Sequence, residues 1–177
     1  MKALIFDTET TDLINSGLLK LDQQPSIIEF YGEVVDLETG TTQEELEHLF
    51  KPPRPITPEI TRITNITNEM VANAPPFAAH ANEIRRIIEE SPAVIAHNVS
   101  FDREAVDIEF ERIGMKVRWP ALICTVEATI CIKGFRLNLT SLHQELFGEP
   151  FTGAHRARHD VQALKRCAVE LFKRGYI

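Results

Sequence analysis

The sequence predicts an α/β fold in which a mixed sheet is flanked by helices. Short apolar runs that suit strands come first, and the later part of the chain alternates such runs with helical periodicity. The chain has 177 residues and 44% hydrophobic content, which suits one core, so we expect residues 1–177 to form a single domain. No repeat or low-complexity tract interrupts the sequence.

The first half of the chain contains three candidate strands in succession. They cover residues 2–7, 26–35 and 46–50, with turn-forming residues at 36–42. Consecutive strands with short connections usually lie side by side, so we expect an antiparallel meander. Prolines between positions 52 and 58 then interrupt the chain, and residues 56–76 are expected to form short helical turns in a surface loop.

The second half alternates helices with short strands. Residues 77–90 carry apolar side chains at helical spacing, and the apolar run at 93–96 predicts a buried strand. The remaining predicted elements are a helix at 101–113, a strand at 122–124, and helices at 125–131, 139–147 and 160–173.

Charge and composition limit the class of protein. The net charge of −7 argues against a protein that coats nucleic acid with a basic face, although carboxylates gathered at a metal site would also add negative charge. No run approaches the ~18 apolar residues of a membrane span, and residues 1–6 are too short for a signal peptide. We therefore expect a soluble, cytoplasmic protein with no membrane contact and with reduced cysteines.

Two carboxylates, Asp7 and Glu9, stand at the end of the first apolar run. Side chains alternate along a strand, so both carboxylates project to one face while Phe6 and Thr8 project to the other. Such a pair suits a hard cation such as Mg²⁺ or Mn²⁺, which prefers oxygen ligands. Acidic residues at strand ends are also commonly just solvated, so the pair needs partners elsewhere in the chain.

A second polar cluster lies between the strand at 93–96 and the next helix. Its members are His97, Asn98, Ser100, Phe101 and Asp102. Asn98 or Ser100 could cap the helix while Asp102 complements the helix dipole. His97 fits either a structural hydrogen bond or a place in a functional site.

A third cluster opens the final helix. It consists of His155, Arg156, Arg158, His159 and Asp160. Asp160 could be a simple N-terminal helix acid, and the two histidines a solvated pair. A zinc site is the poorer choice, because the Glu of an HExxH motif is absent.

Taken together, the three clusters resemble the DnaQ-like, or DEDDh, family of 3′–5′ exonucleases, which includes DNA polymerase proofreading subunits, exodeoxyribonuclease X and RNase T. The matching segments are 6–11, 97–102 and 155–160, and the resemblance runs from Ala3 to about Leu171. It implies an RNase H-like fold with a mixed five-stranded sheet whose first three strands are antiparallel.

The resemblance also implies a metal-dependent reaction. The implied ligands of two Mg²⁺ or Mn²⁺ ions are Asp7, Glu9, Asp102 and Asp160. His155 is the implied general base, because the family motif counts five residues from base to acid, and His159 is not. Arg156 and Arg158 could touch phosphate or lie on a solvated helix face.

On the substrate side, we expect contacts with the 3′ end of nucleic acid. Thr10 and Thr11 would donate hydrogen bonds to the terminal nucleotide. Phe101 could pack under a base, although an aromatic residue that opens a helix is more often part of the core. The other residues expected near the substrate are Glu59, Thr64, His97 and Asn98.

The sequence departs from the family pattern at two places. Asp12 stands where the family usually has Gly, and Thr64 and Asn65 replace a His–Gly pair. Asn tolerates a left-handed backbone, so the turn at Asn65 can survive.

The expected substrate is DNA, released as nucleoside 5′-monophosphates. The alternatives are an RNA exonuclease of the RNase T or oligoribonuclease kind, a non-catalytic polymerase accessory subunit, and a phosphoesterase that acts on small nucleotides. Because no tail follows Ile177 to tether the chain to a polymerase, we expect a stand-alone or weakly associated enzyme.

Overall fold

The computed structural model describes residues 1–14, 20–151 and 156–177. It contains one five-stranded sheet in the order β3-β2-β1-β4-β5. The strands are β1 (Lys2–Thr10), β2 (Ile27–Asp36), β3 (Thr41–Leu49), β4 (Ala93–Ala96) and β5 (Ala121–Cys124). The pairs β1–β2 and β2–β3 are antiparallel, whereas β1–β4 and β4–β5 are parallel. The predicted mixed sheet with an antiparallel first half is therefore confirmed.

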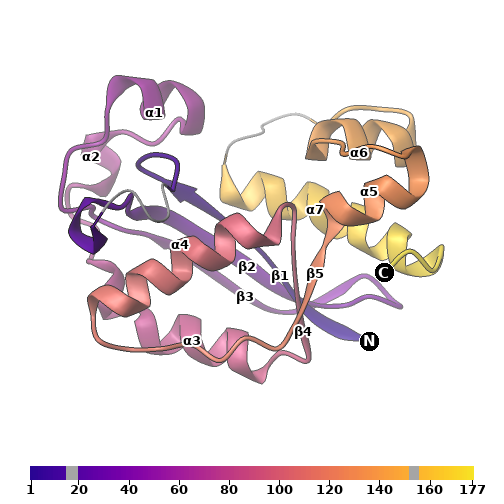
Figure 1. Cartoon of the computed structure of the whole chain (residues 1–177), viewed down its shortest axis with the longest axis horizontal. Coiled ribbons are helices and arrows are strands. Elements are labelled where there is room, and N and C mark those ends of the chain that lie inside the picture. Colours follow the sequence, from indigo (N-terminus) through magenta and orange to yellow (C-terminus); the bar gives the residue numbers. More distant parts are fainter. Residues whose placement is uncertain (15–19, 152–155) are drawn as a thin grey trace.

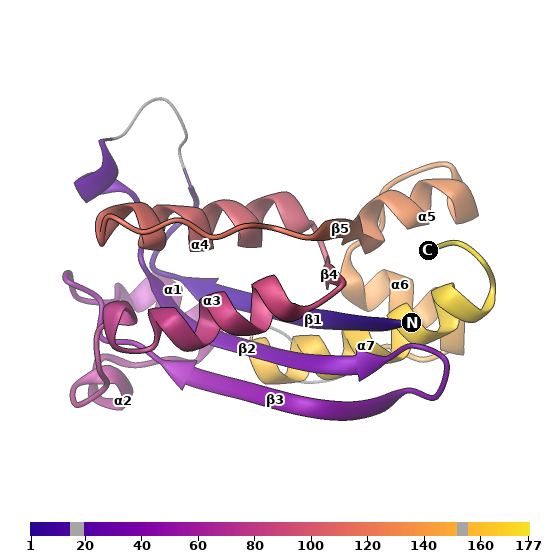
Figure 2. The same ribbon diagram turned by 90° about the horizontal axis from the view of Figure 1, so that it is seen from below.

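Helices cover both faces of this sheet. They are α1 (Pro58–Thr64), α2 (Asn68–Val71), α3 (Ala81–Glu90), α4 (Val99–Arg112), α5 (Thr125–Lys133), α6 (Leu139–Phe147) and α7 (Ala157–Lys173), with 3₁₀ turns η1 (Leu21–Gln23) and η2 (Phe77–Ala79). Figures 1 and 2 show α3 and α4 on one side of the sheet and α7 on the other. Within the described ranges, no helix is both long and apolar enough to cross a membrane.

Alternation along β1 divides the core into two layers. Leu4 and Phe6 pack in the cluster that contains residues of α3 and α4. Ala3 and Ile5 pack in the cluster that contains residues of α7. The odd-numbered side chains of β1 therefore face α7, which fixes the side of the sheet on which its acids project.

Two strands differ from their predicted bounds by more than one residue. β1 continues to Thr10 because its pairing with β2 runs past the acids, with Glu9 opposite Glu29 and a register shift between Glu9 and Thr10. β3 begins at Thr41, five residues before its predicted start, because a polar segment at an open sheet edge lacks the apolar alternation that identifies a strand.

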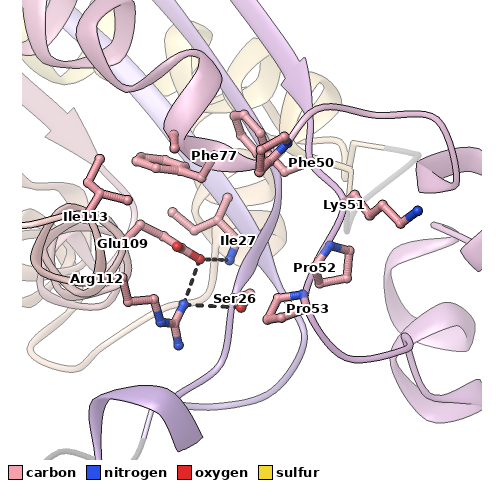
Figure 3. A pocket seen from close by; sticks show the side chains of 12 residues that line it. Ser26, Ile27, Phe50, Lys51, Pro52, Pro53, Phe77, Glu109, Arg112 and Ile113 are labelled. Atoms are coloured by element: carbon pink, nitrogen blue, oxygen red, sulfur yellow. Dashed lines mark hydrogen bonds and ion pairs between the residues drawn. The ribbon is translucent and has the colours of Figure 1, made fainter.

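Arg112 ties the end of α4 to the segment that leads into β2. Its guanidinium donates hydrogen bonds to the carbonyls of Leu21, Gln24 and Pro25 and to Ser26 Oγ, and it pairs with Glu109 at 2.8 Å. Figure 3 shows Arg112 and Glu109 at the wall of a small, mostly apolar cavity. None of the predicted metal ligands lines this cavity.

Candidate active site

Three carboxylates from two elements gather at one end of β1. Asp7 and Glu9 project from β1, and Asp160 projects from the first turn of α7. One carboxylate oxygen from each of the three lies within 4.8 Å of the others. The structure thus brings together three of the acids that the sequence singled out, although 151 residues separate Glu9 from Asp160.

Asp102, the fourth predicted ligand, is hydrogen-bonded to β1 through Thr8. It lies in the first turn of α4, directly after β4, which is the parallel neighbour of β1. Its carboxylate Oδ1 accepts hydrogen bonds from the Thr8 backbone N–H at 3.0 Å and from Thr8 Oγ1 at 2.8 Å, and its side chain is buried. Asp102 therefore stands beside the three acids and is fixed to β1 through Thr8.

The acids oppose one another's ionisation. Burial, and then the charges of Asp102, Glu9 and Asp160, raise the pKa of Asp7 far above its usual value. Burial and the charges of Asp160, Glu29 and Asp102 raise the pKa of Glu9 to about 8. Burial raises the pKa of Asp102 to about 7, even though the hydrogen bonds from Thr8 act in the opposite direction.

A divalent cation fits this arrangement. Repulsion among buried carboxylates is relieved by either a proton or a positive ion, and several oxygen ligands converging on one point suit Mg²⁺ or Mn²⁺. Asp7, Glu9 and Asp160 supply such a set without any nitrogen or sulfur ligand.

Glu29 is a residue of the site region that sequence reasoning missed. It is 0% exposed and lies opposite Glu9 on β2. Its carboxylate binds the Arg156 guanidinium, with Oε1 2.7 Å from Nη2, and accepts a hydrogen bond from the Ala157 backbone N–H at 2.9 Å. These contacts hold the first turn of α7, which carries Asp160, against the sheet. An acid inside the apolar run of 26–35 was the available signal, because buried acids are almost always paired.

The two arginines of the third cluster both pair with carboxylates. Arg156 binds Glu29, while Arg158 binds Glu45 and Glu47 on β3 and lies over the ring of Tyr31 at 4.6 Å. Both arginine side chains therefore attach α7 to β2 and β3. This arrangement was not among the expected ones.

The histidines occupy different surroundings. His155, the predicted general base, lies outside the described residues. His159 is exposed on α7 and lines a cavity of about 400 Å³ with His143 and Arg166. His97 is half-buried, its Nδ1 is 2.9 Å from Thr125 Oγ1, and burial lowers its pKa to about 4, so it is neutral near pH 7.

The threonines expected near the substrate make local hydrogen bonds. Thr10 Oγ1 donates to the Asp12 carbonyl at 2.7 Å, and Thr11 Oγ1 accepts from the Ser26 N–H at 2.9 Å. Thr64 is buried, and its hydroxyl donates to the Ile60 carbonyl. Thr10 and Thr64 thus donate their hydroxyl protons to backbone carbonyls, whereas among the described residues the Thr11 hydroxyl has only an acceptor role.

The other expected substrate residues lie near the ends of helices. Glu59 is exposed in the first turn of α1, and Phe101 is partly exposed at the start of α4. Asn98 precedes α4 in a left-handed conformation, with φ of 72°, and its side chain does not cap the helix. Asn65, which ends α1, has φ of 57°, so the predicted left-handed turn is confirmed.

Comparisons with known proteins agree with this site. Residues 4–167 match the family model described as exonuclease, RNase_T. The chain is 29% identical over 162 residues to the PolC-type DNA polymerase III of Staphylococcus aureus. The aligned region covers 90% of this chain but only 10% of that polymerase.

Solved structures of similar fold include two nucleases. Exonuclease X, in complex with 5′ overhanging duplex DNA, has a TM-score of 0.69 and 25% identity, and the match covers 98% of this chain and 93% of that one. The nuclease domain of 3′hExo, a DEDDh family member bound to rAMP, has a TM-score of 0.80 and 16% identity, over 98% and 92% of the two chains. The family match over most of the sequence shows that the chain belongs to the exonuclease family, and the gathered acids agree with that membership.

Proposed function

We propose that residues 1–177 act as one exonuclease domain that removes nucleotides from the 3′ end of DNA in the cytoplasm and releases nucleoside 5′-monophosphates. The observation that carries the proposal is the convergence of Asp7, Glu9 and Asp160 within 4.8 Å, on the fold of the exonuclease family. DNA is preferred because the 29% identical relative is a DNA polymerase and Exonuclease X is bound to DNA.

In this proposal the acids hold two divalent cations. Asp7, Glu9, Asp102 and Asp160 would be the ligands, and the cations would supply charge stabilisation at the attacking and leaving oxygens. The raised pKa values of Asp7 and Glu9 support this assignment, because burial and the neighbouring carboxylates both disfavour the ionised side chains, which a bound cation would stabilise.

The chain's own groups then move the protons. His155 would accept a proton from the attacking water, whose oxygen bonds to the terminal phosphorus. The bond between phosphorus and the 3′ oxygen of the preceding nucleotide breaks, and that oxygen takes up a proton to become the new 3′-hydroxyl. Thr11 directly follows β1, its hydroxyl oxygen accepts a hydrogen bond from the Ser26 N–H, and in this proposal its hydroxyl would donate to the terminal nucleotide.

Association with a DNA polymerase belongs to the same proposal. Its support is that the matched segment of the PolC-type relative is part of a polymerase chain. Co-elution of this chain with a replicative polymerase on gel filtration would support the association, and separate elution at micromolar concentration would contradict it.

The activity is tested by a gel time course on 5′-labelled single-stranded DNA and RNA of matched sequence. The reactions contain Mg²⁺, Mn²⁺ or a chelator, and compare wild type with Asp7→Asn and with Asp36→Asn. Asp36 is a matched control because it pairs with Lys2 at the opposite end of the same β1–β2 ladder.

With metal, we expect a ladder of products that shortens from the 3′ end, fastest on DNA. This ladder should be lost in Asp7→Asn and retained in Asp36→Asn. Faster loss of RNA would make the chain an RNA exonuclease. Absence of degradation of both polymers with both metals would contradict the catalytic proposal and favour an accessory role.

A further inference from the structure

A second group of metal-binding side chains lies away from the acids, where β3 meets α3. His48 stands near the end of β3, His80 directly precedes α3, and Glu83 lies in the first turn of α3. Figure 2 shows the end of β3 and the start of α3 at the same end of the molecule. One ligand atom from each of these three residues lies within 4.8 Å of the others.

The group lies on the opposite face of the sheet from the acids. His48 is paired with Phe30 on β2, and Phe30 packs in the core layer that contains α3 and α4. The acids of β1 project toward α7 instead, so neither group can share an ion with the other.

The geometry of the group suits one metal ion. His48 Nε2 and His80 Nδ1 both approach the same oxygen, Glu83 Oε2, at 3.0 and 3.3 Å. In a tetrahedral site with bonds of about 2.0–2.1 Å, neighbouring ligand atoms lie about 3.3 Å apart. The observed spacing is therefore close to that of ligand atoms around a metal.

The two imidazoles are also held side by side before any ion binds. Their rings stack with centroids 3.7 Å apart and an angle of 27° between planes, and His48 packs on Phe50. Two protonated rings at this separation would repel each other, and a single carboxylate oxygen serves both nitrogens. A dication would satisfy all three side chains at once through their lone pairs.

We propose that His48, His80 and Glu83 form a binding site for a transition-metal dication of the Zn²⁺ class, which joins the edge strand β3 to α3. Two imidazoles and one carboxylate suit Zn²⁺, Co²⁺ or Ni²⁺, whereas the all-oxygen cluster on the other face suits Mg²⁺ or Mn²⁺. The Glu83 side chain is 45% exposed, which leaves a position for water as the fourth ligand. This inference does not depend on the proposed nuclease reaction.

The direct test is a Zn²⁺ titration of the metal-free chain, followed by NMR of the imidazole nitrogens. The Asp7→Asn background weakens the acidic cluster, so that zinc binding there does not obscure the result. We expect saturable shifts at His48 Nε2 and His80 Nδ1. Zinc at about 100 times its Kd should also raise the melting temperature by roughly 5 to 10 °C.

Variants separate binding from a plain hydrogen-bond cluster. His48→Gln, His80→Gln and Glu83→Gln should each lower zinc affinity by at least about tenfold, given that even outer partners of metal sites contribute 10–100-fold. Glu90→Gln, on the same helix and also exposed, should bind zinc as wild type does. Mg²⁺-dependent nuclease activity should be retained in His48→Gln, because the two groups lie on opposite faces.

Two results would overturn the proposal. One is the absence of shifts at His48 and His80 at millimolar Zn²⁺, both in Asp7→Asn and in the unsubstituted chain. The other is a zinc-induced rise in melting temperature that persists in His48→Gln and His80→Gln.

Discussion

Replacing Glu29 with Gln tests whether the Glu29–Arg156 pair positions Asp160. The substitution keeps the size of the side chain and one acceptor oxygen, but it removes the charge and the two-oxygen contact with the Arg156 guanidinium. The Ala157 N–H, now bonded to Oε2, must share or lose its acceptor.

The magnitude follows from the burial of the two partners. Removing one partner of a fully buried ion pair costs about 3–5 kcal/mol. The Glu29 side chain is 1% exposed but that of Arg156 is 29% exposed, so water can partly solvate the guanidinium left behind. We therefore expect a loss of about 2–3 kcal/mol in the free energy of unfolding, and a drop of roughly 5 to 10 °C in melting temperature.

Activity should fall further than stability alone explains. If the first turn of α7 shifts, Asp160 moves relative to Asp7 and Glu9, and small displacements of catalytic groups cost about 100-fold in rate. The assay is single-turnover cleavage at saturating Mg²⁺, at a temperature where the variant is fully folded by circular dichroism.

Glu33→Gln is the matched control. Glu33 lies four residues further along the same strand and face, is also buried, and pairs with Lys165 of α7 at 2.6 Å. It should lose comparable stability yet keep most of the cleavage rate, because it does not contact the first turn of α7. Equal rates in Glu29→Gln and wild type, or equal losses of rate in both variants, would refute the positioning role.

Three further predictions concern the acids and their neighbours. Because the pKa of Glu9 is raised to about 8, the metal-free folded state binds more protons than the unfolded state between about pH 4.5 and 8, so its stability should fall as pH rises through this range. Melting curves recorded with a chelator should show this fall, and curves recorded with Mg²⁺ should not. A melting temperature that does not change with pH in chelator would argue against buried, mutually repelling acids. Thr8→Val removes the hydroxyl donor to Asp102 Oδ1, so in the presence of Mg²⁺ it should lower the free energy of unfolding by about 1–3 kcal/mol and raise the Mg²⁺ concentration needed for half-maximal cleavage. Thr8→Ser should restore both quantities. An unchanged Mg²⁺ requirement in Thr8→Val would contradict this role of Thr8. His97 should remain neutral down to about pH 5 in an NMR titration, because burial lowers its pKa to about 4, and protonation near pH 6.5 would show that the ring is solvated.

Much of the fold was predictable because its elements carry strong local signals. β4 at 93–96 and α6 at 139–147 have the predicted bounds. A four-residue apolar run marks β4, and Asn138 before α6 and Gly148 after it are typical residues for the start and the end of a helix. The start of α4 was placed two residues late, because the helix begins after Asn98, whose left-handed backbone leaves no sequence pattern of its own.

The candidate site was predictable only where spacing along the chain carries information. The placement of Asp7 and Glu9 on one face follows from strand alternation, and their meeting with Asp160 was expected from the family pattern. Glu29–Arg156 and His48–His80 were missed because each pair joins residues far apart in sequence, and no local periodicity records which side chains the packing of two elements brings together.

The polar sequence of β3 has a consequence for the whole molecule in solution. This strand forms one margin of the sheet, and an exposed margin offers free backbone groups to any other extended chain. Its middle part carries Glu44, Glu45 and Glu47, which are bound to Arg86 and Arg158. Two copies that approached with these edges side by side would bring their rows of carboxylates together. The composition that hid the first five residues of β3 from prediction is thus also what discourages self-association and fibril growth along this edge.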